Sequence, residues 1–186
     1  MKKKRLLVFH PALAPYRIDF FNSLNEQYDA QFYFFNENLL NQKFDQNKLR
    51  NAVKFNYKFL NLGFNLPGRS FRFGAWKAIT TEQPDIVICT EYNLINLIII
   101  LKCFLSKHKI TVYSICDDHI LKAESASFLR KISRKIQLNL LTGIILTHHD
   151  IIHWYKKKFK RCPSLLEFPI IRKEDLFNKQ LEASLP

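Results

Sequence analysis

Short apolar runs alternate along the chain with longer segments in which apolar residues recur every three to four positions. The short runs are rich in β-branched residues, which predicts buried parallel strands. The periodic segments predict helices that pack one face against a sheet. The predicted strands cover residues 6–9, 31–35, 53–59, 86–89, 110–115, 143–147 and 165–168. The predicted helices cover residues 15–28, 39–49, 94–105 and 149–159, with one more beginning at Ser70 and another at Ser125 or Ser127.

Strand and helix follow one another in this order from end to end, without an internal repeat. The order predicts an α/β fold, a Rossmann-like and mainly parallel sheet with helices on both faces. In segment 53–59 the apolar residues alternate with polar ones, so we expect this strand near the edge of the sheet. The 186 residues suffice for one well-packed domain, and we expect a single domain over 1–186.

Polar residues follow two predicted strands at the centre of the chain. Ligands of parallel sheets bind beyond the carboxyl ends of the strands, so these tips are candidate site residues. The first loop, between strand 6–9 and helix 15–28, adds further polar candidates. The candidates are Glu91, Tyr92 and Asn93 after one strand, Asp117, Asp118 and His119 after the other, and His10, Tyr16 and Arg17 in the first loop.

The helix that ends at Leu140 is amphipathic in sequence. We expect its apolar residues to face the sheet and its basic residues to face outward. The inward set is Phe128, Leu129, Ile132, Ile136 and Leu140, and the outward set is Arg130, Lys131, Arg134 and Lys135. A second basic cluster over 156–161 lies beside Trp154 and Tyr155. Either cluster is a solvated face or a surface for anionic lipid, and the sequence leaves both open.

The formal net charge is +13, from 29 Lys and Arg against 16 Asp and Glu. This balance favours an anionic partner, which can be a membrane surface, a phosphorylated substrate or nucleic acid. The four cysteines have no CxxC spacing, so neither a zinc ribbon nor a redox pair is indicated. His149 and His153 have helical i, i+4 spacing but no evident third ligand, so no metal site is predicted.

The N-terminal apolar run is too short for a signal peptide, and the run over 93–105 is too short to span a bilayer. Unpaired core thiols fit a reducing compartment. These features predict a cytoplasmic protein, either free or peripheral on the inner face of the membrane.

Several segments together resemble the N-terminal domain of family 4 glycosyltransferases, which transfer sugars from nucleotide-sugars and have the two-domain GT-B fold. The segments are HPALAPYRIDFFNSL, PDIVICTEYN, ITVYSICDDH, TGIILTHHDIIHWYKKKF and LLEFPIIRKEDLF. The first resembles the loop and helix of members that act on lipid-linked or surface-polysaccharide sugars. The chain departs from the family at three places. HPALAPYR lacks a glycine pair, Cys116 and Asp117 stand where many members have a His, and Pro169 is followed by Ile170 where the family has Asn.

The resemblance implies that residues 1–186 form the acceptor-side half of such an enzyme and end in an interdomain linker at about 170–186. The donor-binding domain would follow it, so the chain alone would be inactive. No cofactor is implied; the implied partners are a nucleotide-sugar donor and a lipid-linked or cell-surface glycan acceptor. In this reading Asp117, Asp118 and His119 are catalytic, and Glu91, Tyr92, Asn93, His10, Tyr16 and Arg17 bind substrate.

Two functions of other classes compete with this reading. The charge and the aromatic content fit a nucleic-acid-binding module, but the aromatic residues have core periodicity and form no exposed stacking stripe, so we expect no nucleic acid. A freestanding Rossmann-like nucleotide enzyme is the other alternative. Neither GxGxxG nor GxxxxGK[ST] occurs in the sequence, which argues against it.

Overall fold

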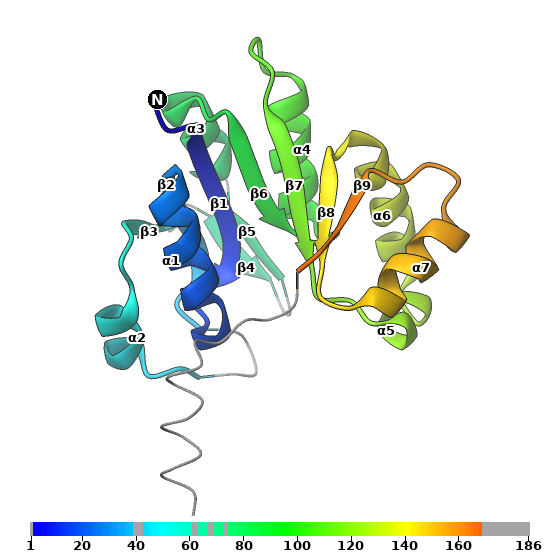
Figure 1. The fold of residues 1–186 in the computed structure, drawn as a ribbon, viewed down its shortest axis with the longest axis horizontal. Helices are drawn as coiled ribbons and strands as arrows, with labels where there is room; N and C mark the ends of the chain where they lie inside the picture. Colours follow the sequence, from blue (N-terminus) through cyan, green and yellow to red (C-terminus); the bar gives the residue numbers. More distant parts are fainter. Residues whose placement is uncertain (1, 39–42, 61–62, 67–68, 73, 169–186) are drawn as a thin grey trace, which may run out of the picture.

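The computed structural model describes residues 2–38, 43–60, 63–66, 69–72 and 74–168. Its centre is a seven-stranded sheet in the order β3-β2-β1-β6-β7-β8-β9, in which every neighbouring pair is parallel (Figure 1). The strands are β1 (Arg5–Ala12), β2 (Asp29–Asn36), β3 (Tyr57–Phe59), β6 (Ile86–Thr90), β7 (Thr111–Cys116), β8 (Gly143–Leu146) and β9 (Ser164–Glu167). The predicted Rossmann-like fold is confirmed, since successive strands are added outward from β1 in both directions, β2 and β3 on one side and β6 to β9 on the other.

Helices lie on both faces of the sheet. The helices are η1 (Pro15–Arg17), α1 (Ile18–Gln27), α2 (Gln46–Ala52), α3 (Gly74–Glu82), α4 (Leu94–Phe104), α5 (Ile120–Glu124), α6 (Phe128–Leu140) and α7 (His149–Lys158). On one face, alternate strand residues such as Leu7, Phe9 and Val87 form a core with α3, α4, α6 and α7. On the other face, Val8 and Phe34 belong to a second core with α1 and α2, which cover the β1–β3 half (Figure 1).

Three segments differ from the sequence prediction. The strand expected over 53–59 is only β3, Tyr57–Phe59, although it does lie at the sheet edge. Ser70, expected to cap a helix, lies instead in a two-stranded antiparallel hairpin of β4 (Gly63–Leu66) and β5 (Arg69–Arg72). Of the loose helix expected over 39–49, residues 39–42 lie outside the described part of the chain. The described part forms α2, which begins at Gln46 because the Asp45 side chain accepts hydrogen bonds from two backbone amides there.

The orientation predicted for α6 is wrong for most of its apolar residues and for Arg134, whereas Lys131 and Lys135 are exposed as expected. Phe128 and Leu129 are 75% and 66% exposed, whereas Arg134 is only 1% exposed. Helix α4 also presents large apolar residues to solvent, including Leu94 and Phe104. The periodicity of apolar residues shows that a helix has two distinct faces, but it does not show which face packs against the sheet.

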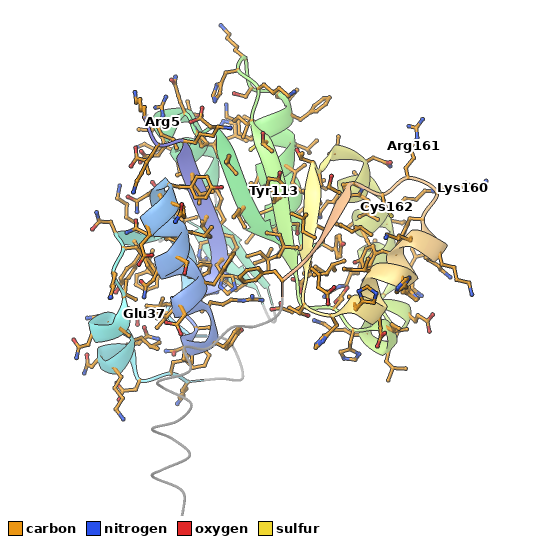
Figure 2. All side chains as sticks on the ribbon, viewed as in Figure 1. Arg5, Glu37, Tyr113, Lys160, Arg161 and Cys162 are labelled. Atoms are coloured by element: carbon orange, nitrogen blue, oxygen red, sulfur yellow. The ribbon has the colours of Figure 1, made fainter. Side chains whose placement is uncertain are left out.

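The remaining expectations concern the cysteines and the membrane. Cys89, Cys103 and Cys116 are buried free thiols, and Cys162 is half-buried. In the part of the chain that the structure describes, no helix is both long and apolar enough to cross a bilayer. Lys160 and Arg161 of the second basic cluster project from the loop after α7 (Figure 2). The predicted linker at about 170–186 lies outside the described residues.

Candidate functional site

The carboxyl ends of β1, β6 and β7 lie next to one another, because these strands are neighbours in a parallel sheet. This brings the acidic tips of β6 and β7 to one edge. Arg130 on α6 joins them directly: its Nη2 lies 3.3 Å from Glu91 Oε1 and 3.1 Å from Asp118 Oδ1. Lys122 on α5 repeats the bridge at 3.7 and 3.4 Å. We call this group of charged residues, together with Arg17, Asp117 and Arg134, the acidic rim.

Asp118 is the buried centre of the rim. Its side chain is fully enclosed, and Oδ2 lies 2.6 Å from Nη2 of the equally buried Arg134. Arg134 also donates to the Ala123 carbonyl oxygen at 3.0 Å and lies over the Tyr92 ring at 4.9 Å. A carboxylate in such a position is stable only when paired, and its enclosed oxygens cannot reach a substrate. The position gives Asp118 a structural role in place of the catalytic one expected from sequence.

Glu91 lies nearer the surface, with 18% of its side chain exposed. Burial raises the pKa of Glu91, while the Lys122 ammonium opposes that rise and the Asp117 carboxylate adds to it. Such a carboxyl holds its proton more readily than an ordinary glutamate. It can therefore accept hydrogen bonds from a ligand as the carboxylate and exchange a proton at a pH above its ordinary range.

Asp117 is the most open of the three acids, with its side chain 38% exposed. It pairs with Arg17, which η1 carries and which is 98% buried. Tyr16 is half-buried beside this pair; burial raises its pKa, and the Asp117 carboxylate raises it further. The second carboxylate oxygen of Asp117, which Arg17 does not engage, is thus available in a partly exposed side chain next to a phenol.

The other predicted site residues have structural contacts. His10 is 4% exposed, and its Nδ1 donates to the Ala12 carbonyl oxygen at 2.8 Å; burial lowers its pKa to about 4, so it is neutral at pH 7. The Tyr92 hydroxyl is buried 2.6 Å from that of Tyr155. Asn93 and His119 are exposed residues whose side chains cap α4 and α5.

The rim therefore contains part of the predicted set together with residues that sequence reasoning missed. It includes Glu91, Asp117, Asp118 and Arg17, and Tyr16 lies beside it. Lys122, Arg130 and Arg134 were not predicted as site residues. A signal for two of them existed, because Arg130 and Arg134 are i, i+4 neighbours and must lie on one helix face.

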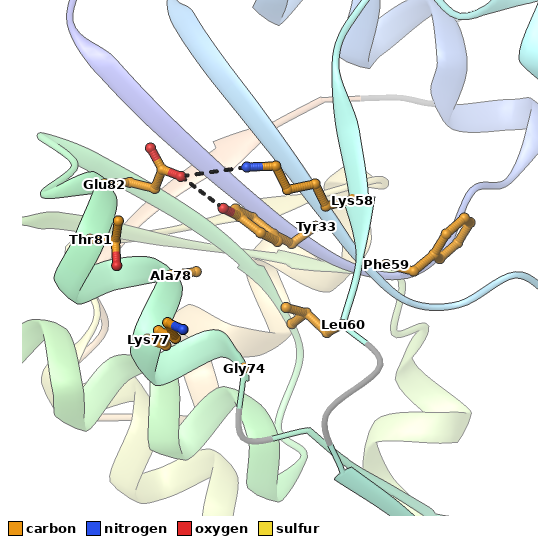
Figure 3. A pocket seen from close by; sticks show the side chains of 9 residues that line it. All are labelled: Tyr33, Lys58, Phe59, Leu60, Gly74, Lys77, Ala78, Thr81 and Glu82. Carbon is orange, nitrogen blue, oxygen red and sulfur yellow. Dashed lines mark hydrogen bonds and ion pairs between the residues drawn. The ribbon is translucent and has the colours of Figure 1, made fainter.

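Two cavities lie outside the carboxylate tips, one of them distant from the rim and the other lined in part by Arg134 of the rim. One, of about 360 Å³, lies between the edge strand β3 and α3, where Tyr33 donates to Glu82 Oε1 at 3.0 Å and Lys58 lies 3.9 Å from the same oxygen (Figure 3). Its lining is mainly apolar, and the Glu82 carboxylate is already engaged. The other, of about 380 Å³, lies between α5, α6 and α7 and is rich in lysine.

Histidines on α7 contact one another at the surface. His153 Nε2 lies 2.9 Å from His149 Nε2, and His149 Nδ1 lies 3.0 Å from Glu167 Oε2. Over the described ranges, no group of three or more His, Cys, Asp or Glu side chains is arranged to hold a metal ion.

No protein-family model matches the chain, and neither does any curated protein sequence. Among solved structures, the chain is similar to Phytolacca americana UGT2 complexed with UDP-2fluoro-glucose and pterostilbene. The TM-score is 0.61 at 12% sequence identity, and the match covers 100% of this chain and 58% of that chain. At this identity the likeness shows the fold alone, and it agrees with a Rossmann-like fold for this chain.

Proposed function

We propose that the chain is the acceptor-binding domain of a GT-B glycosyltransferase, related to family 4, which moves a sugar from a nucleotide-sugar to a lipid-linked or cell-surface glycan. One observation supports this above the others. A fold similar to that of a GT-B glycosyltransferase carries two partly exposed carboxylates, Glu91 and Asp117, at the carboxyl edge of its sheet. That edge is where Rossmann-like domains bind their ligands.

In this proposal the rim orients the acceptor. Glycosyl transfer requires an acceptor hydroxyl held against the anomeric carbon of the donor while the phosphate leaves. Sugar hydroxyls are hydrogen-bond donors, and carboxylates accept strongly, so Glu91 and Asp117 are suited to hold them. Arg17 fixes Asp117 from the buried side. Glu91, with its raised pKa, is the better placed of the two acids to exchange a proton with a hydroxyl.

The nucleotide-sugar is proposed to bind mainly outside these 186 residues, in a second domain closing on the rim. The likeness to UGT2 extends over only 58% of that chain, which is compatible with this arrangement. The proposal predicts that the isolated 186-residue protein turns over no nucleotide-sugar. It also places the protein at the cytoplasmic face of the membrane, where lipid-linked acceptors are found.

The test is a transfer assay on the natural full-length gene product, with radiolabelled nucleotide-sugars as donors and a membrane lipid extract as acceptor. We expect Glu91→Gln and Asp117→Asn each to lower kcat/KM at least 10-fold, which corresponds to about 1.4 kcal/mol. Glu37→Gln, a substitution in the chain after β2, is the matched control and should leave the rate unchanged. Transfer by the 186-residue protein alone, or full activity of both rim variants, would contradict the proposal.

A further inference from the structure

Helix α6 presents an apolar row to solvent. Phe128, Ile132 and Ile136 are spaced i, i+4, i+8, so they lie one above another on the helix, and they are 75%, 41% and 44% exposed. Leu129, 66% exposed, widens the row. The neighbouring α4, which packs against α6, adds Leu94 at 51% exposed. Continuous apolar surfaces of this kind are rare on soluble monomers and mark sites of interaction.

The adjacent row of the same helix is basic. Lys131 and Lys135 are also i, i+4 neighbours, and each directly precedes a residue of the apolar row. Both are exposed and line the cavity of about 380 Å³, with Lys158 and Trp154 of α7 on its opposite side. Among the described residues, no ion pair within 4.0 Å engages these three lysines.

The cavity has an excess of positive charge. Its remaining lining is Ala123, Glu124, Arg134 and Phe159. Arg134 is neutralised by Asp118, and the Glu124 carboxylate accepts a hydrogen bond from Trp154 Nε1 at 3.0 Å. Three lysines thus face one acid in a recess between three helices, which suits a ligand with a compact negative group such as a phosphate.

These two rows together match the two parts of a phospholipid. We propose that α6 docks on a membrane containing anionic phospholipid, with a headgroup phosphate bound among Lys131, Lys135 and Lys158 and the Phe128–Ile132–Ile136 row inserted beside it. Helices that lie in a bilayer interface combine an apolar face with flanking lysines in this way, and tryptophan favours the same depth. A second copy of the chain is the poorer occupant, because each copy carries a net charge of +13 and a symmetric contact would bring the lysines together.

Docking of this kind deepens the membrane location in the proposed function, but it does not require sugar transfer and therefore fails separately from it. The assay is co-sedimentation of the 186-residue protein with vesicles of phosphatidylglycerol and phosphatidylcholine, compared with vesicles of phosphatidylcholine alone. We expect binding to the anionic vesicles only. Lys131→Gln with Lys135→Gln should weaken it roughly 30-fold, because each lysine near an anionic surface contributes about fivefold. The control, Lys48→Gln with Lys54→Gln, removes the same charge from the region of α2.

A second arm tests the apolar row. Phe128→Ser with Ile132→Ser should abolish most of the vesicle binding and leave the melting temperature unchanged, because both side chains are already exposed. Leu166→Ser, at a residue of β9 that is 45% exposed, is the matched control. Trp76→Phe leaves Trp154 as the only tryptophan of the chain, and its emission should shift to the blue when anionic vesicles are added.

Several results would overturn the inference. Equal binding to neutral vesicles would show that no anionic headgroup takes part in the docking. Binding that neither double substitution changes would show that α6 is not the docking surface. Inorganic phosphate binding as tightly as the vesicles would show that the cavity takes the free anion. A dimer in solution that Phe128→Ser with Ile132→Ser dissociates would assign the apolar row to a second copy.

Discussion

The buried ion pair of Asp118 and Arg134 yields the sharpest test of the structure. Removing one member of such a pair leaves the other charged and enclosed, which costs about 3–5 kcal/mol. Arg134→Met should fall at the lower end, because Asp118 keeps Arg130 at 3.1 Å and Lys122 at 3.4 Å. Asp118→Asn should fall at the upper end, because the Arg134 guanidinium would keep only the Ala123 carbonyl oxygen and its ring contacts. Either loss is a large part of the ~5–15 kcal/mol that stabilises a typical domain.

The measurement is the free energy of unfolding in urea for the two single variants and the double variant. The double variant should cost less than the sum of the singles by roughly 1–3 kcal/mol, since the two side chains share one interaction. Lys48→Met breaks an exposed pair with Asp45 at 4.0 Å and should cost no more than about 0.5 kcal/mol. A loss below ~1 kcal/mol for Asp118→Asn, or additive singles, would refute the buried pair.

Three further predictions test other parts of the structure. Burial lowers the pKa of His10 from 6.5 to about 4, so below pH 6.5 the unfolded chain binds a proton that the folded chain does not. The free energy of unfolding should therefore fall by up to about 3 kcal/mol as the pH drops to 4. His10→Asn should remove this pH dependence, as measured by urea titrations at each pH. The pKa of Glu91 is raised instead, so the folded protein loses stability as the pH rises above 4.5. Glu91→Gln should reduce this loss. A variant that is less stable than the parent at about pH 8 would show that the ion pair with Arg130 outweighs the cost of burial. Gly143→Ala would place a methyl group 2.7 Å from the Tyr113 ring and 3.1 Å from the Ser164 carbonyl oxygen. It should lower the melting temperature and reduce the free energy of unfolding by roughly 1–3 kcal/mol. The control is Gly74→Ala, whose methyl group meets only the flexible tip of Leu60, and an equal loss there would contradict this reasoning.

The sequence by itself determined the seven strands of the parallel sheet and the polar tips of β6 and β7. Apolar runs of β-branched residues such as 86–89 leave few alternatives to a buried strand, and the alternation of strand with helix leaves few alternatives to a parallel sheet. Because parallel strands end at one edge, the sequence also predicted that Glu91 and the Asp117–Asp118 pair would lie together, and they do.

Which of these acids faces solvent was decided only by the tertiary structure. The α6 sequence has an apolar face and a basic face, and burying apolar residues alone would turn Phe128 and Ile132 inward. The end of β7 sets a different orientation of α6. The buried carboxylate of Asp118 needs cations nearby, and α6 supplies Arg130 and Arg134. With α6 in this orientation, Phe128 and Ile132 are exposed to solvent. Periodicity records the two faces of a helix, whereas the choice between them depends on charges more than ten residues away in sequence.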